Sequence, residues 1–379
     1  MSPALSSLLL FLAFLPAPTP HVVWVALVPW LLHAERAGRS GAGVAEAART
    51  AARVLGLFWA LHLSWVLLLV PRLGVVWPLW AYLGQVLLLA LLGGAAGAGI
   101  HALRFRSALP LPVAAALGWI GVEWARGHLL GPLRFPWSPL ALPLADALPF
   151  VQPAAWIGES GLGMGVVAVN GVVATAWLAR GRELQPWRVR PHRPVFLLVA
   201  AGVLTAWWGM GRARLAGLHS EEVVTAGVLQ PGLPLDVKRD SVRALAAARE
   251  RVDELLPGLR DRGAEVVVIP ETHYPVVFTW TGGGVRDPWA QAVIRELADW
   301  ARELGVEILA GGYGEAEEGV TNAIVRVTPE GPVEVYAKVA LVPGVERAPG
   351  SRMIPGPPPV PLHAPGRPGP LICIESAWS

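Results

Sequence analysis

The sequence predicts two parts: a polytopic α-helical membrane domain, and after it an α/β domain. Hydrophobic residues make up 54% of the 379 residues and charged residues only 16%, and the mean hydropathy is +0.48. Residues 1–215 carry 16 Lys and Arg against 6 Asp and Glu, whereas residues 216–379 carry 15 against 22. Fourteen of the 18 Trp residues lie in the first part, where indoles anchor membrane helices at the headgroup level. This composition excludes a wholly soluble enzyme, and we place the domains at 1–215 and 222–379.

The first domain contains apolar runs that predict about seven transmembrane helices. Each run ends at Pro, Gly or a charged cluster, and the runs are residues 4–17, 21–33, 54–70, 76–100, 111–125, 161–179 and 195–210. The first two are shorter than the roughly 20 residues of a perpendicular span, and the Pro-rich break between them predicts a tight hairpin. A cleaved signal peptide is the alternative for residues 1–17, but a basic amino-terminal region and a small-residue cleavage site are missing there.

The distribution of arginine predicts how these spans are oriented. The loops after spans two, four and six carry eleven Arg residues, and the loops after spans three and five carry three. Because short cytoplasmic loops retain Arg, the amino terminus is expected in the cytoplasm and the α/β domain on the extracytoplasmic side.

One ionisable pair lies within a predicted span. Glu123 and Arg126 are three residues apart, on one helical face near a membrane boundary. The pair either orients the helix at the interface or contacts a headgroup or substrate, and the sequence leaves both open. The loop that follows, residues 131–137, combines aromatic residues and Pro, for which interfacial anchoring is the simpler interpretation.

The second domain alternates strand and helix patterns, which is typical of an α/β layered fold. β-branched or apolar runs predict strands at residues 223–230, 265–271, 307–311, 322–328, 333–336 and 370–374. Amphipathic periodicity predicts helices at residues 240–256 and 288–304.

Three residues in the predicted strand ends could form a catalytic group. Glu271 and Lys338 follow strands, and Cys373 lies in the last apolar run. Taken singly, they read as a solvated Glu, a surface Lys and a small buried thiol. Together they supply a nucleophile, a base and a cation for an oxyanion. His273, beside Glu271, is a weaker candidate and reads as a pocket or surface residue. The single cysteine excludes an internal disulfide and a cysteine-cluster metal site.

At Glu271, Lys338 and Cys373 the chain resembles the nitrilase superfamily, an αββα sandwich with a Glu, Lys, Cys triad in that order. The whole chain resembles the apolipoprotein N-acyltransferase family, in which seven spans precede such a domain. The matching segments are Leu63–Val66, Glu123–Gly127, Phe135–Trp137, Gln152, Gly158, Asn170, Val228–Gln230, Lys238, Pro270–Thr272, Tyr336–Lys338, Leu341–Pro343, Glu346 and Cys373–Glu375.

This resemblance implies a role for each site residue. Glu271 would be the general base, Lys338 would stabilise the oxyanion, and Cys373 would be the nucleophile. Glu346 would be an accessory carboxylate, and Glu375 matches a family position near the site.

The family's reaction moves an acyl chain from the sn-1 ester of a phospholipid to a Cys thioester. The amino-terminal diacylglyceryl-Cys amine of an apolipoprotein then takes the chain, at the outer face of the bacterial cytoplasmic (inner) membrane. The resemblance implies no metal, no dissociable cofactor and no nucleic-acid partner.

Two departures from the family bear on these expectations. First, Gly344 and Val345 precede Glu346, where the family has an aromatic residue and Gly. Second, the sequence ends six residues after Cys373, where the family continues through a second sheet and an eighth span. We therefore expect an incomplete sandwich, and a 379-residue product that folds poorly outside the membrane and lacks transferase activity. The alternatives are a membrane-tethered nitrilase-type amidase, a truncated inactive homologue, and a polytopic scaffold or transporter.

Overall fold

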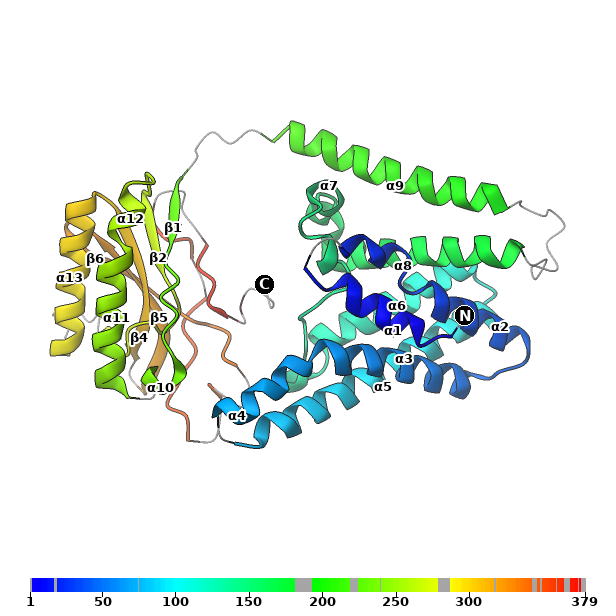
Figure 1. Cartoon of the computed structure of the whole chain (residues 1–379), viewed down its shortest axis with the longest axis horizontal. Helices are drawn as coiled ribbons and strands as arrows, with labels where there is room; N and C mark the ends of the chain where they lie inside the picture. The colour runs from blue at the N-terminus through cyan, green and yellow to red at the C-terminus, as the bar shows by residue number, and fades with distance from the viewer. Residues whose placement is uncertain are drawn as a thin grey trace. The chain divides into compact units, whose positions relative to one another are not determined.

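The computed structural model divides into two compact units, Met1–His219 and Ser220–Ser379, and each is described by itself (Figure 1). The described residues are 2–16, 19–73, 75–180, 193–218, 224–238, 240–278, 287–316, 318–342, 346–347, 350–358, 360–364, 369–373 and 375. Arg182, Arg188 and Arg190 of the predicted inside loop, and residues 343–345, lie outside them.

The first unit is built from helices. In chain order they are α1 (Leu5–Ala13), η1 (Pro20–Trp24), α2 (Val28–Arg39), α3 (Val44–His62), η2 (Ser64–Leu68), α4 (Leu69–Leu73), α5 (Trp77–Phe105), α6 (Leu111–His128), η3 (Gly131–Leu133), η4 (Leu142–Leu144), α7 (Leu148–Val151), α8 (Ala154–Arg180) and α9 (Arg193–Ala216). Helices α2, α5 and α6 each have Pro in the first two positions, where the missing N–H would have no helical partner.

Three described helices are long and apolar enough to cross a membrane: Trp77–Phe105, Ala154–Ala179 and Val195–Ala216. The bent pair Val44–His62 and Ser64–Pro71, with 42° between its parts, could be a fourth span. These four coincide with four of the seven predicted runs. The other three runs fall in α1, in η1 with α2, and in α6, which do not meet the same length and composition criterion. Seven spans therefore stays a prediction.

The break between α1 and α2 is closed by a buried amide from α8. Asn170 is fully buried, accepts from the Leu27 N–H at 2.8 Å and donates to the Val23 carbonyl at 2.9 Å. Broken helical backbone in an apolar environment needs such partners. Asn170 thus supplies hydrogen-bond partners to the backbone of the predicted hairpin, at positions where the hairpin has no helical partner of its own.

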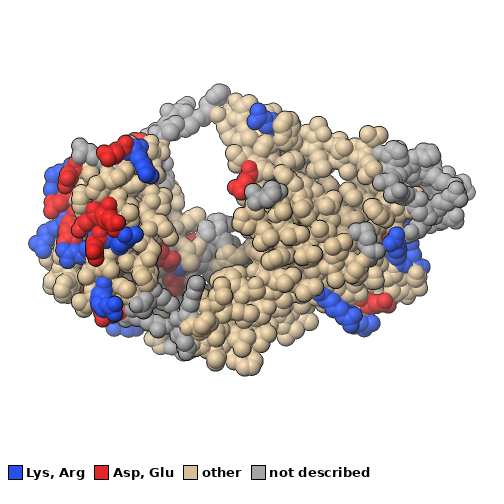
Figure 2. Space-filling model, viewed as in Figure 1, with Lys and Arg blue, Asp and Glu red and all other residues tan. Residues whose placement is uncertain are grey.

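The second unit contains a sheet and helices. Its elements are β1 (Ala226–Val228), α10 (Leu235–Lys238), α11 (Ser241–Leu255), α12 (Pro257–Arg260), β2 (Val266–Ile269), β3 (Val277–Phe278), α13 (Pro288–Leu304), β4 (Glu307–Ala316), β5 (Gly319–Thr328) and β6 (Gly331–Ala337). The charged side chains seen in Figure 2 gather on this unit, whereas the visible surface of the helical unit is mostly uncharged.

The strands form one six-stranded mixed sheet in the order β1-β2-β4-β5-β6, with β3 also paired to β4. β1, β2 and β4 run parallel, and β4, β5 and β6 run antiparallel to their neighbours in turn. Helices α11 and α13 cover one face (Figure 1). Val267 and Ile269 of β2 point into that helical core, and Val266 and Val268 point to the opposite face, as the period of two in a strand requires.

The opposite face is covered by the extended segment near the end of the sequence. Leu362, Ala364 and Ile372 pack there against Leu309 of β4 and Tyr336 of β6. The described ranges show one sheet with helices on one face, and the second sheet of an αββα sandwich is not among them. The complete sandwich stays an expectation from the resemblance.

Two strand predictions need correction. Residues 370–374 were predicted as a strand, but the described residues around Cys373 form a turn rather than a strand, and Ile374 lies outside the described residues. The physical reason is that the Glu375 carboxylate accepts the Ile372 N–H at 2.7 Å, so this N–H is not available to a sheet. The predicted strand 307–311 continues to Ala316, because small residues at Gly311 and Gly312 allow close packing along it.

The Gly311→Ala variant tests this close packing. A Cβ at Gly311 would lie 2.2 Å from the Pro270 carbonyl oxygen and 2.8 Å from the Glu271 Cα. We expect the free energy of unfolding of the second unit to fall by about 1–3 kcal/mol, the usual cost of overpacking. The urea midpoint of the second unit, measured by pulse proteolysis of the full chain in detergent, reports this change. Gly258→Ala, where a Cβ meets nothing within 4 Å, is the control, and equal midpoints for both variants would contradict the account.

Candidate active site

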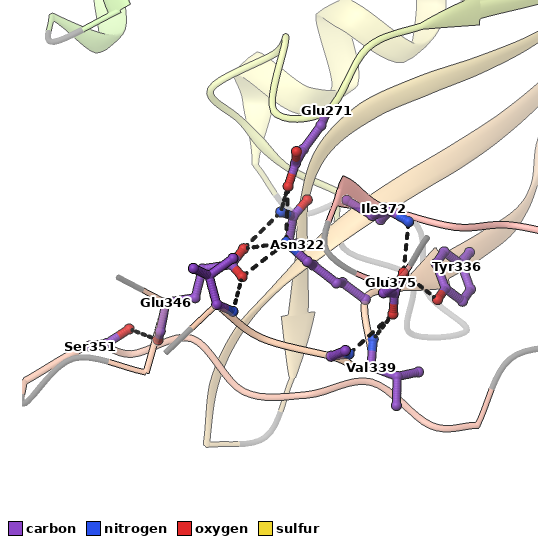
Figure 3. A network of polar contacts seen from close by, with 11 residues as sticks. Glu271, Asn322, Tyr336, Val339, Glu346, Ser351, Ile372 and Glu375 are labelled. Atoms are coloured by element: carbon purple, nitrogen blue, oxygen red, sulfur yellow. Dashed lines mark hydrogen bonds and ion pairs between the residues drawn. The ribbon is translucent and has the colours of Figure 1, made fainter. Parts of the chain in front are cut away.

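The candidate site lies at one end of the sheet (Figure 3). Glu271 follows β2, Asn322 lies in β5, and Lys338 follows β6. The Lys338 N–H donates to the Asn322 carbonyl at 2.8 Å, which continues the β5–β6 pairing by one residue. The sheet register therefore brings together side chains that are up to 67 residues apart.

Lys338 is at the centre of an ion-pair cluster. Its Nζ lies 3.1 Å from Oε1 of Glu271 and 2.9 Å from Oε2 of Glu346. The Lys338 side chain is fully buried, whereas that of Glu346 is 10% exposed and that of Glu271 is 34% exposed. Glu271 is thus the member of the cluster that a ligand could reach.

The cluster keeps its charges despite its burial. Burial by itself lowers the pKa of Lys338, but hydrogen bonds and charges from Glu346 and Glu271 outweigh it, and the pKa is raised. Burial likewise acts to raise the pKa of Glu346, but the Val342 N–H, the Asn322 amide and Lys338 together lower it. A cationic Lys338 beside an anionic Glu346 is the stable state near neutral pH.

Asn322 is a member of this cluster that the sequence analysis missed. Its Nδ2 donates to Oε1 of Glu271 at 2.6 Å and to Oε1 of Glu346 at 3.0 Å. Its buried Oδ1 has no hydrogen-bond partner in the described structure. Asn322 is the single amide in the mainly apolar strand Gly319–Thr328, and this was the available signal. Its side chain fixes the direction of both carboxylates.

A second network surrounds Glu375. Its Oε1 accepts the N–H groups of Val339 at 2.6 Å and Ala340 at 3.1 Å, and its Oε2 accepts the Tyr336 hydroxyl at 2.8 Å and the Ile372 N–H at 2.7 Å (Figure 3). Glu375 is buried, and its four donors come from both sides of Lys338 and from the residue before Cys373. Glu375 therefore ties the segment that carries Cys373 to the segment that carries Lys338.

Cys373 is exposed and has a left-handed backbone, with φ of 55°. The buried thiol suggested by its apolar neighbours is therefore wrong. Positive φ in a residue other than Gly costs energy and is frequent at functional positions. A position for the sulfur within reach of Glu271 stays a prediction.

His273 is not part of the cluster. It is buried, contacts the Ala248 carbonyl of α11 at 3.1 Å through Nε2, and packs edge-on against Tyr274. Burial lowers its pKa. His273 fastens the loop after β2 to the helical layer, so it is not a surface residue.

The structure places Glu123 and Arg126 inside the first unit, with both side chains less than 10% exposed. Their ion pair measures 3.6 Å, Glu123 also accepts the Leu140 N–H at 2.8 Å, and Arg126 donates to the Trp137 carbonyl at 2.5 Å. The pair thus clamps the loop after α6. Among the residues that the structure describes, no group of three or more His, Cys, Asp or Glu could hold a metal ion.

Comparison with known proteins shows similarity to apolipoprotein N-acyltransferases. Residues 6–172 match the apolipoprotein N-acyltransferase N-terminal domain. The apolipoprotein N-acyltransferase of Chlorobaculum tepidum is 25% identical over an alignment of 374 residues, and the match covers 93% of this chain and 66% of that protein. The apolipoprotein N-acyltransferase of a Nostoc species is 26% identical over an alignment of 359 residues, and the match covers 88% of this chain and 65% of that protein. The chain thus spans about two thirds of the length of these curated relatives.

The stability of the second unit should depend on pH through this cluster. Because the folded pKa of Glu346 is below its ordinary 4.5, its contribution is complete above about 4.5 and is lost as the pH falls through the folded pKa. Because the folded pKa of Lys338 is above 10.5, its contribution is complete below 10.5 and is lost as the pH rises through the folded pKa. Urea midpoints of the full chain across pH, measured by pulse proteolysis, should fall at both extremes.

The Glu346→Gln variant is the control for the acid side of that profile. It removes the titrating carboxylate while it keeps the side-chain volume, so the fall in midpoint below about pH 4.5 should become shallower. An unchanged acid profile in this variant would contradict the assignment to Glu346.

Proposed function

We propose that this chain is a member of the apolipoprotein N-acyltransferase family and transfers an acyl chain from a phospholipid to the amino-terminal amine of an apolipoprotein. This proposal replaces the expectation of an inactive product, because the described residues bring Glu271, Lys338 and Glu346 into one cluster. One observation carries the proposal: the buried Lys338 is held between Glu271 and Glu346 and is tied through Glu375 to the segment of the exposed Cys373. The nitrilase-like mechanism, the donor and the acceptor belong to the proposal.

In the first half-reaction, the Cys373 sulfur attacks the sn-1 ester carbonyl of a phospholipid. Glu271 takes the thiol proton, and the cationic Lys338 stabilises the oxyanion of the tetrahedral intermediate. The ester C–O bond then breaks, the proton passes from Glu271 to the leaving lysophospholipid alkoxide, and a thioester remains on Cys373.

In the second half-reaction, the α-amine of the diacylglyceryl-Cys at the amino terminus of the apolipoprotein attacks this thioester. Glu271 takes a proton from the amine, the C–S bond breaks, and the proton returns to the sulfur. The two half-reactions make a ping-pong cycle that starts and ends with the thiol and uses neither a metal nor a dissociable cofactor.

Glu346 and Glu375 support this cycle without taking part in proton transfer. Glu346 balances the charge of Lys338, and through the shared Asn322 amide it helps to direct the Glu271 carboxylate. Glu375 holds the backbone on both sides of the site. Such positioning supplies much of the rate when the reacting groups must meet in one geometry.

The proposed location follows from the arginine distribution. With the amino terminus in the cytoplasm, the second unit lies on the extracytoplasmic side of the bacterial cytoplasmic (inner) membrane. Both proposed substrates are anchored in lipid, so a site at the outer leaflet could receive each of them from the bilayer.

Intact mass spectrometry of the full chain after incubation with phospholipid tests the first half-reaction. Because a thioester should accumulate when the acceptor is absent, we expect a mass gain of one acyl chain that hydroxylamine removes. Cys373→Ser should abolish this gain. Glu271→Gln should slow it by about 10²–10⁴-fold, the usual contribution of a general base. Glu254→Gln, an exposed carboxylate on α11, is the matched control and should leave it unchanged.

The other outcomes distinguish the competing functions. A chain that forms no adduct, while it remains folded, would contradict the proposal and favour an inactive homologue. Release of ammonia from a small aliphatic amide that depends on Cys373, without an acyl adduct from phospholipid, would favour the membrane-tethered amidase.

A further inference from the structure

The helical unit contains a pocket that the proposed acyl transfer does not use. Its wall is mostly apolar and includes Phe14 of α1, Phe58 of α3 and Leu89 of α5. Three polar side chains also line it: Glu123 and Arg126 of α6, and Ser138 of the loop after α6. An apolar pocket with a few convergent polar groups is the usual form of a small-molecule site.

Ser138 has a base within hydrogen-bond distance. His62, the last residue of α3, lies with its Nε2 2.9 Å from the Ser138 Oγ. The imidazole is held by rings from the pocket wall: it stacks on Phe58 with 5.3 Å between centroids and meets Phe14 edge-on at 4.9 Å. A hydroxyl and an imidazole at this distance are the geometry of a nucleophile and its general base, in the tautomer that carries its proton on Nδ1.

The backbone at Ser138 is strained and firmly held. Its φ is 55°, in the left-handed region that residues with a Cβ avoid. The strain persists because neighbouring contacts fix the loop: the Trp137 carbonyl accepts from Arg126 at 2.5 Å, and the Leu140 N–H donates to Glu123 at 2.8 Å. Strained backbone that is held in place by its surroundings is typical of catalytic residues, and nucleophilic serines commonly lie on such turns.

The same pocket holds a cation suited to a developing negative charge. The Arg126 side chain is 7% exposed, and its guanidinium lies over the rings of Trp59 and Phe135 at 5.4 and 5.9 Å. A fixed positive charge in a site with little water stabilises an oxyanion far better than one in solution.

We propose that Ser138 and His62 form a second nucleophile–base pair, which takes carboxylic esters with an apolar acyl chain. The Ser138 oxygen bonds to the ester carbonyl carbon and gives its proton to Nε2 of His62. The ester C–O bond breaks, and His62 returns the proton to the leaving alcohol. Water then attacks the acyl-serine by the reverse proton path, which releases a carboxylic acid and restores the hydroxyl.

The pair is independent of Cys373, so its test uses the full chain with Cys373→Ala in lipid nanodiscs. The probe is an alkyl fluorophosphonate, which reacts with activated serines, and peptide mass spectrometry locates the modified residue. We expect modification at Ser138, its loss in Ser138→Ala, and a rate about 100-fold lower in His62→Phe, which keeps an aromatic ring but removes the base. The control is Ser64→Ala. Ser64 is an exposed serine just after α3, and its loss should leave the rate unchanged.

Two results would overturn the proposal: modification only at serines other than Ser138, or a Ser138 rate that His62→Phe does not change. Even if the Ser138→Ala or His62→Phe variant fails to fold, peptide mass spectrometry of the Cys373→Ala chain alone shows whether Ser138 is the modified serine. Because the thiol is absent from every sample, failure here leaves the proposed acyl transfer at Cys373 untouched, and failure of Cys373 acylation leaves this result untouched.

Discussion

The buried ammonium group of Lys338 is the constraint on which the second unit depends. A charge that is removed from water must find partners, and here two carboxylates and the sheet itself supply them. Glu271 comes from the end of β2, and Glu346 from the loop after β6. The parallel pairing of β2 with β4 and the antiparallel order β4-β5-β6 are therefore both needed to bring these three side chains to one place.

Asn322 and Glu375 extend this constraint to the surrounding backbone. The Asn322 amide lies between the two carboxylates that would otherwise repel each other, so it reduces the cost of holding them together. Glu375 accepts hydrogen bonds from the backbone N–H groups of Val339, Ala340 and Ile372, which lie outside the strands, and from the hydroxyl of Tyr336 in β6. The segment with Cys373 is thus fixed by a buried carboxylate rather than by a strand ladder, and this leaves its thiol exposed.

The sequence predicted those parts of the fold whose signals are local. Helix α13 begins and ends where predicted, because Asp287 caps its first turn and Gly305 takes the left-handed conformation after Leu304. The strand ends that carry Glu271 and Lys338 were also predicted, and the sheet brings these two residues into contact. The contacts of Asn322 and the closure of the first hairpin by Asn170 could not be predicted, because they depend on partners distant in sequence, up to 147 residues away for Asn170. The turn at Cys373 was missed because the Glu375 carboxylate that accepts the nearby Ile372 N–H is itself held by Val339 and Ala340, 36 and 35 residues away.

The central claim is that Glu271 acts on the thiol of Cys373, and the alkylation rate of the chain's single cysteine tests it most directly. In this account Glu271 takes the proton of the thiol, so Glu271→Gln should lower the rate of Cys373 alkylation by iodoacetamide at neutral pH. Glu254→Gln, remote on the α11 surface, should leave the rate unchanged. A Glu271→Gln rate equal to that of Glu254→Gln would contradict the account, because the carboxylate and the thiol would then not share a site.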